Sequence, residues 1–81
     1  MEQEILHILQ EINPYMEIET DTKLLEEEIL DSMEILLLIS ELEVQYQIQI
    51  PLESLQLEDF QDILSITKFV KKQIEGTQYD N

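Results

Sequence analysis

The 81-residue sequence contains no cysteine, and no apolar run in it approaches the ~20 residues that a helix needs to span a bilayer. Without cysteine, neither a disulfide nor a thiolate metal site can stabilise the fold, and the oxidising compartments in which small domains depend on such bonds are not indicated. Residues 1–4 are acidic, whereas a secretory signal would begin with basic residues. We therefore expect a cytoplasmic protein that does not insert into a membrane.

Basic residues are also scarce. Four Lys and Arg residues stand against nineteen Asp and Glu, and the formal net charge is −15. Such a charge repels phosphate backbones and anionic lipid, which nearly excludes nucleic acid as a partner, and it attracts basic protein surfaces. An acidic chain can be disordered, but 43% of these residues are hydrophobic and recur with helical spacing. We expect one small folded domain, weakened by repulsion among its acidic residues.

Apolar residues recur at spacings of three and four over residues 2–12, 32–46 and 66–75. This period is that of an amphipathic α-helix, so three main helices are predicted. Asn13 and Pro14 end the first of them. The inward face predicted for the second and longest helix consists of Ile35, Leu38, Ile39, Leu42 and Tyr46. The predicted fold class is all-α.

The predicted final helix has Ser65 as its N-cap and Gly76 as the residue that stops it. A short helical turn is predicted before it, over residues 58–62. Residues 77–81 are expected to fray, as chain ends commonly do. The single domain is therefore assigned to residues 1–76.

Two segments between the helices lack helical periodicity. The connection over residues 14–30 is too long for a turn between antiparallel helices, and its apolar residues are expected to anchor it against the bundle. These residues are Tyr15, Met16, Ile18, Leu24, Leu25, Ile29 and Leu30. Residues 45–51 alternate as a strand does, but no second alternating segment could pair with them. An extended segment with Ile48 and Ile50 turned inward is predicted instead.

The tetrapeptide Leu30-Asp31-Ser32-Met33 lies where this connection ends and the longest helix begins. Asp31 is a strong N-cap candidate because its carboxylate can accept from first-turn N–H groups, and Glu34 stands where a capping box places its partner. Ser32 is then the first helical residue, at the positive end of the helix dipole, where an attached anion such as a phosphodiester is favoured. A serine at such a position is common, and these features alone do not mark it as functional.

His7 and the acidic residues offer little catalytic or metal-binding chemistry. His7 lies one helical turn before Glu11, and a weak surface pair is favoured over a catalytic role because no nucleophile accompanies the histidine. The acidic residues between residues 17 and 28 lack the Asp-x-Asp-x-Asp-Gly spacing of a calcium loop, which favours a solvated surface over a cation site. We expect neither a catalytic residue nor a metal site in this chain.

The order of these parts closely resembles the acyl carrier protein and peptidyl carrier protein family over nearly the whole chain. Residues 30–33 carry this resemblance, together with residues 48–51 (Ile-Gln-Ile-Pro) and the apolar row of Leu38, Leu42 and Tyr46. The combined spacing is specific, whereas an Asp-Ser pair alone is not. The resemblance implies a four-helix bundle of three main helices and one short helix, with a long loop between the first two.

In this family the serine corresponding to Ser32 carries 4′-phosphopantetheine, attached from coenzyme A by a separate phosphopantetheinyl transferase with magnesium. The resemblance therefore implies a carrier and not an enzyme, in which the thiol of the arm holds an acyl or aminoacyl group as a thioester. The absence of cysteine agrees with this implication, because a thioester on this chain would need the thiol of a prosthetic group. For Asp31 the resemblance implies support of the modification site in addition to helix capping.

The second helix is the family's recognition surface, which basic patches on partner enzymes contact. Glu34, Glu41 and Glu43 match its acidic character, whereas Leu37 and Val44 stand where fatty-acid carriers commonly show acidic residues. We expect a mixed apolar and acidic docking surface. It comprises Met33, Glu34, Leu37, Glu41 and Val44. The partners implied are the transferase, a ligase that loads the acyl or aminoacyl group, and acceptor enzymes with basic patches.

Glu28 also departs from the family pattern, since many members carry a glycine shortly before the Asp-Ser pair. The segment after Pro51 looks more like that of stand-alone carriers, such as the D-alanyl carrier protein and carriers of secondary-metabolite clusters. Cargo and pathway stay open, and we expect a monomer. Two other interpretations remain. One is a helical interaction module with the carrier fold but no prosthetic group, and the other is a small enzyme, which one histidine and scattered carboxylates disfavour.

Overall fold

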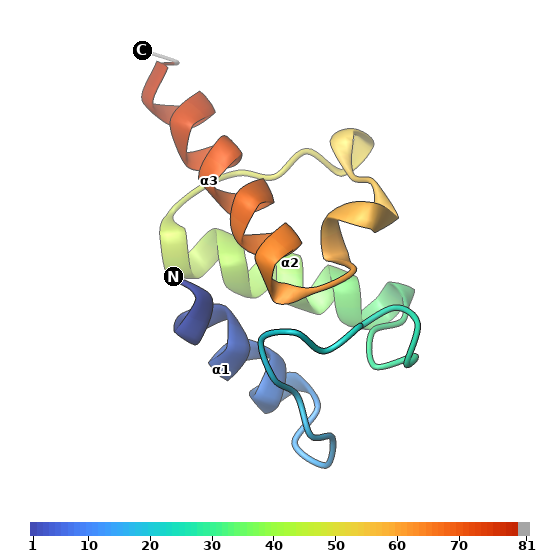
Figure 1. Ribbon diagram of the computed structural model, residues 1–81. Coiled ribbons are helices and arrows are strands. Elements are labelled where there is room, and N and C mark those ends of the chain that lie inside the picture. The colour runs from blue at the N-terminus through green and yellow to red at the C-terminus, as the bar shows by residue number, and fades with distance from the viewer. Residues whose placement is uncertain (80–81) are drawn as a thin grey trace.

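Three α-helices make up most of the protein, and no β-strand occurs in residues 1–79 (Figure 1). The computed structural model describes these 79 residues, with side chains through residue 76. The helices are α1 (Glu2–Ile12), α2 (Ser32–Tyr46) and α3 (Ile63–Tyr79), and two short 3₁₀ helices, η1 (Leu52–Ser54) and η2 (Leu57–Phe60), lie between α2 and α3. The all-helical prediction is confirmed, and α1 and α2 have the predicted bounds.

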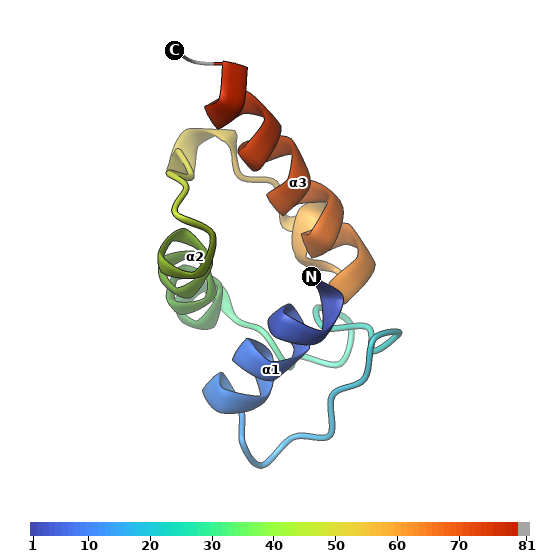
Figure 2. The same ribbon diagram turned by 90° about the vertical axis from the view of Figure 1, so that its left-hand side faces the viewer.

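The helices enclose one apolar core, and α1 packs against both α2 and α3 (Figure 2). The buried face of α2 is the predicted one, formed by Ile35, Leu38, Ile39 and Leu42, with Tyr46 partly buried at its end. Phe60 of η2 is fully buried, and its ring centroid lies 5.4 Å from that of Phe69 in α3. This aromatic contact fixes η2 against the last helix.

Residues 13–31 join α1 to α2, and four apolar side chains of this segment are buried. These are Ile18, Leu24, Ile29 and Leu30. Tyr15 and Met16 were expected to anchor the segment as well, and that prediction is wrong, because they are 98% and 48% exposed. The Met16 N–H donates to the Asn13 carbonyl in a turn after α1, and this turn belongs to the loop that extends beyond the helices at the bottom of Figure 1.

The start and end of α3 differ from the prediction. The Ser65 N–H donates to Asp62 Oδ1 at 2.8 Å, so Asp62 is the N-cap and Ser65 lies inside the first turn. The helix also continues past Gly76, where a Cβ would meet no atom within 4 Å, so nothing at this position requires a glycine. Of the predicted frayed tail, residues 77–79 belong to α3, and residues 80–81 lie outside the described part of the chain.

The segment after α2 runs extended beside the bundle, as predicted. Gln47 adopts a left-handed conformation with φ of 53° and ends α2, as C-terminal residues of helices often do. Ile48 and Ile50 are then buried, and their inward orientation is confirmed. The predicted turn over residues 58–62 is present as η2, whereas η1 was not expected.

Candidate functional site

A complete capping box holds the start of α2. The Glu34 N–H donates to Asp31 Oδ1 at 2.8 Å, and the Asp31 N–H donates to Glu34 Oε1 at 3.2 Å. The Ile35 N–H donates to the Asp31 carbonyl at 2.9 Å. The predicted N-cap and its partner are therefore confirmed, and together they fix the direction in which the chain enters the helix.

Ser32 is exposed and is the first residue of α2. Within residues 1–79 its hydroxyl makes no hydrogen bond to another group. The position lies at the positive end of the α2 dipole, where first-turn N–H groups favour a nearby anion. The hydroxyl is therefore accessible to a reagent.

The backbone before Ser32 is anchored through Leu24. The Leu24 carbonyl accepts from the N–H groups of Ile29 and Leu30, at 2.9 and 3.2 Å, and the Leu24 N–H donates to the Gln61 carbonyl at 2.8 Å. Leu24 thus connects the backbone just before Ser32 with Gln61, the residue that follows η2. Glu28 lies in the loop that the Leu24 hydrogen bonds close. Its φ is 56°, a left-handed conformation that glycine adopts without strain.

The face of α2 opposite the core is largely apolar. We define the outer α2 face as Met33, Leu36, Leu37 and Val44, whose exposed fractions are 69, 47, 53 and 78%. Three of these residues were predicted. Leu36 was not, because the helical pattern alone does not show which edge of the inward face is left uncovered. Exposed apolar side chains at helical spacing on one face are typical of an interaction surface.

The acidic residues of α2 have different roles in the structure. Glu34 serves the capping box, and Glu43 Oε2 accepts from the Ile50 N–H at 2.8 Å, so both contribute to local structure. Glu43, which matches the acidic character expected of this helix, is half-buried, and its carboxylate holds the extended segment after α2. Glu41 is exposed, and within residues 1–79 its side chain has no hydrogen-bond or ion-pair partner.

One side-chain hydrogen bond ties the far end of α2 to α1. The Tyr46 hydroxyl donates to Glu4 Oε1 at 2.7 Å. Burial of the hydroxyl raises the pKa of Tyr46 above its usual value, and the hydrogen bond to Glu4 and the charge of that carboxylate raise it further. The bond links the C-terminal end of α2 to the first turn of α1, and these two helix ends lie on the left of Figure 1, away from the start of α2.

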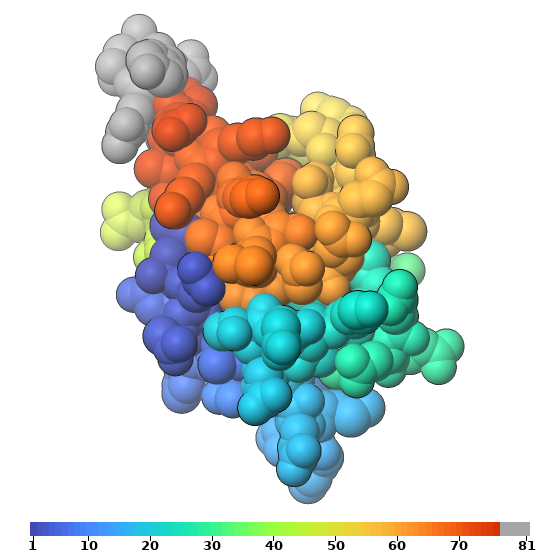
Figure 3. All heavy atoms as spheres, viewed as in Figure 1, coloured from blue at the N-terminus to red at the C-terminus, as the bar shows by residue number. Residues whose placement is uncertain are grey.

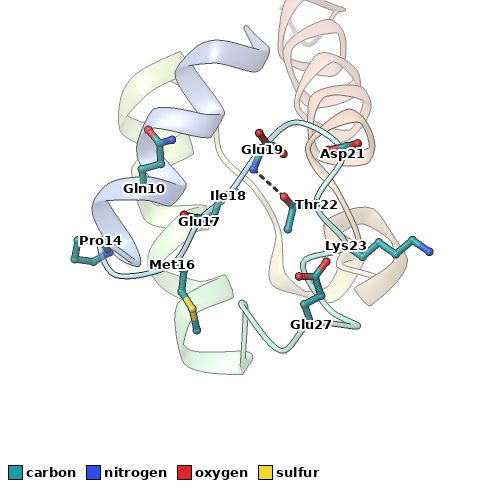
Figure 4. Close-up of a pocket in the computed structure, with 10 residues that line it drawn as sticks. All are labelled: Gln10, Pro14, Met16, Glu17, Ile18, Glu19, Asp21, Thr22, Lys23 and Glu27. Carbon is teal, nitrogen blue, oxygen red and sulfur yellow. Dashed lines mark hydrogen bonds between the residues drawn. The ribbon is translucent and has the colours of Figure 1, made fainter.

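The remaining polar groups form surface features. His7 Nε2 lies 3.0 Å from Glu11 Oε1, and both side chains are exposed, which agrees with the predicted surface pair. In the described part of the chain, no three His, Asp or Glu side chains are placed to hold a metal ion. A hollow of about 830 Å³ beside the connection has Glu17, Glu19 and Asp21 on its rim, and its side chains point in different directions (Figure 4). The one hydrogen bond drawn there joins the Glu19 N–H to Thr22 Oγ1.

None of the helices in residues 1–79 combines the length and the apolar character that crossing a bilayer requires. No protein-family model, no curated protein and no solved structure matches the chain.

Proposed function

We propose that this protein is a carrier that holds an acyl or aminoacyl group as a thioester on a 4′-phosphopantetheine arm attached to Ser32. The observation that carries the proposal is the exposed Ser32 hydroxyl, which has no hydrogen bond within residues 1–79, directly after a complete capping box. The resemblance of residues 30–33 and 48–51 to the carrier family supports it. The carrier would be a cytoplasmic monomer whose η2 corresponds to the short fourth helix of that family.

The residues at the start of α2 fit such an arm. The Ser32 oxygen would form a bond to phosphorus while the phosphoanhydride bond of coenzyme A breaks, adenosine 3′,5′-bisphosphate leaves, and the hydroxyl proton passes to a base of the transferase. The positive end of α2 then stabilises the phosphodiester, and the Asp31 cap keeps Ser32 in the first turn. The arm would supply the thiol that this cysteine-free chain lacks.

The outer α2 face supports a role in partner recognition. It begins at Met33, beside the proposed attachment site, and continues to Val44, so an enzyme that acts on the arm could contact it. Exposed Glu41 and the overall negative charge favour basic patches on a transferase, a loading ligase and acceptor enzymes. Val44→Glu should weaken use of the carrier by a partner while leaving the fold intact. Leu64→Glu, at an exposed leucine of α3, is the matched control.

The test of the proposal is intact mass before and after incubation with coenzyme A, magnesium and a broad-specificity transferase. We expect a gain of one phosphopantetheine by the native chain and none by Ser32→Ala. The exposed apolar side chains of α2 also suit a helical interaction module without a prosthetic group. No gain with several transferases, on protein shown to be folded by circular dichroism, would overturn the carrier proposal in favour of that module.

A further inference from the structure

A second hollow lies between the connection to α2 and the η2 segment. We define the η2 hollow by Leu25, Leu57, Glu26, Glu58, Asp62 and Lys23, and its volume is about 420 Å³. This is within the range of about 300–1,000 Å³ that small-molecule sites occupy. In Figure 3 the teal surface of the connection lies directly below the gold and orange surface of residues 57–62, which form the other wall.

The η2 hollow and Ser32 belong to one hydrogen-bonded unit. The Leu24–Gln61 backbone bond of 2.8 Å connects the two walls of the hollow. The carbonyl of the same Leu24 accepts from Leu30, two residues before Ser32, at 3.2 Å. In Figure 1 the start of α2, the end of the connection and η2 lie at the same end of the molecule. The Leu24 hydrogen bonds therefore place residue 30, two residues before Ser32, directly beside the wall of the hollow that Lys23 and Leu25 form.

The lining of the η2 hollow combines apolar and acidic groups. Leu57 is 64% exposed and Leu25 is partly buried, so both present apolar surface to a ligand. Lys23 Nζ lies 3.6 Å from Glu26 Oε2, and Asp62 Oδ1 accepts from the Ser65 N–H. The carboxylate of Glu58 has no hydrogen-bond or ion-pair partner in residues 1–79. The hollow therefore has three carboxylates and one lysine, and this balance favours the binding of a cation over that of an anion.

We infer that the η2 hollow receives the end of the arm when the cargo is a small aminoacyl group, with the apolar part on Leu25 and Leu57 and the ammonium beside Glu58. The inference rests on the proposed attachment of the arm to Ser32. It deepens that proposal by naming the cargo class, because a neutral acyl group of the same shape leaves Glu58 unpaired and a dicarboxylic acyl group is repelled.

The test uses the absence of cysteine. Ser32→Cys provides a unique thiol, to which haloacetamide arms of pantetheine length can be coupled without any transferase. Three stable amide-linked cargos are compared: alanyl with its free ammonium, neutral propionyl, and anionic succinyl. The readout is the change in backbone amide NMR shifts at Leu25, Leu57 and Glu58 relative to the uncoupled protein, together with its dependence on salt.

The alanyl arm should produce the largest shifts at these residues. We expect a docked population about two- to fourfold higher than with propionyl, as an exposed ion pair provides, and the least docking with succinyl. Glu58→Gln should reduce the alanyl effect to the propionyl level, whereas Glu53→Gln in η1 should leave it unchanged. Equal shifts for all three cargos, or shifts confined to residues 31–35, would overturn the inference. Failure of the transferase to modify native Ser32 would instead overturn the carrier proposal.

Discussion

Removing the Asp31 cap tests how the start of α2 is held. Asp31→Ala deletes the acceptor of the Glu34 N–H and frees the Glu34 side chain, so both bonds of the capping box are lost or weakened. Because the capping box is exposed, water can replace part of the lost hydrogen bonding. The free energy of unfolding should therefore fall by about 1 kcal/mol, as it does when an ordinary N-cap is removed. For a domain of this size, such a loss lowers the midpoint of thermal unfolding by about 4–8 °C.

Asp31→Asn is the control that separates capping from charge. Both substitutions remove one negative charge from a chain of net charge −15, which by itself relieves repulsion. Asparagine keeps a side-chain oxygen and is as good an N-cap as aspartate. Thermal unfolding is followed by circular dichroism at fixed salt. The midpoint of Asp31→Asn should be close to that of the native protein, and the midpoint of Asp31→Ala should be lower. Equal midpoints for the two variants would refute this account of the cap.

Three further predictions concern stability. Glu28→Gly should raise the free energy of unfolding by about 0.5–1 kcal/mol in urea titrations, because Glu28 has φ of 56°, whereas the control Glu27→Gly should not raise it. The pKa of Tyr46 is raised in the fold, so the native state keeps this proton to a higher pH than the unfolded chain does. The free energy of unfolding should therefore fall as the pH rises above about 10, and Tyr46→Phe should reduce that fall. Adding NaCl should raise the melting temperature by screening the acidic residues, and an insensitive midpoint would contradict that expectation.

Features encoded by local spacing were predictable from the sequence. The bounds of α1 and α2 and the Asp31–Glu34 capping box follow from apolar periodicity and from residues a few positions apart. The start of α3 was missed because Asp62 and Ser65 can both act as N-caps, and only the packing of Ile63 in the core selects the earlier residue.

Features that depend on how distant segments meet were not predictable. Glu43 holds the Ile50 N–H because the chain turns back after Gln47, and the helical pattern of α2 contains no sign of that path. The exposure of Leu36 likewise depends on which edge of α2 its neighbours leave uncovered. At the candidate site, the position of Ser32 and its N-cap were predicted. The Leu24 hydrogen bonds that anchor the backbone before Ser32 became visible only in the structure.

The most direct test of the carrier role is to locate the modification within the chain. After incubation with coenzyme A, magnesium and a transferase, the product is fragmented and its peptides are analysed by mass spectrometry. The account predicts that the phosphopantetheine lies on the fragment containing Ser32, with Ser40 of the same helix unmodified. An unmodified Ser32 in folded protein, or modification at another serine, would contradict the account.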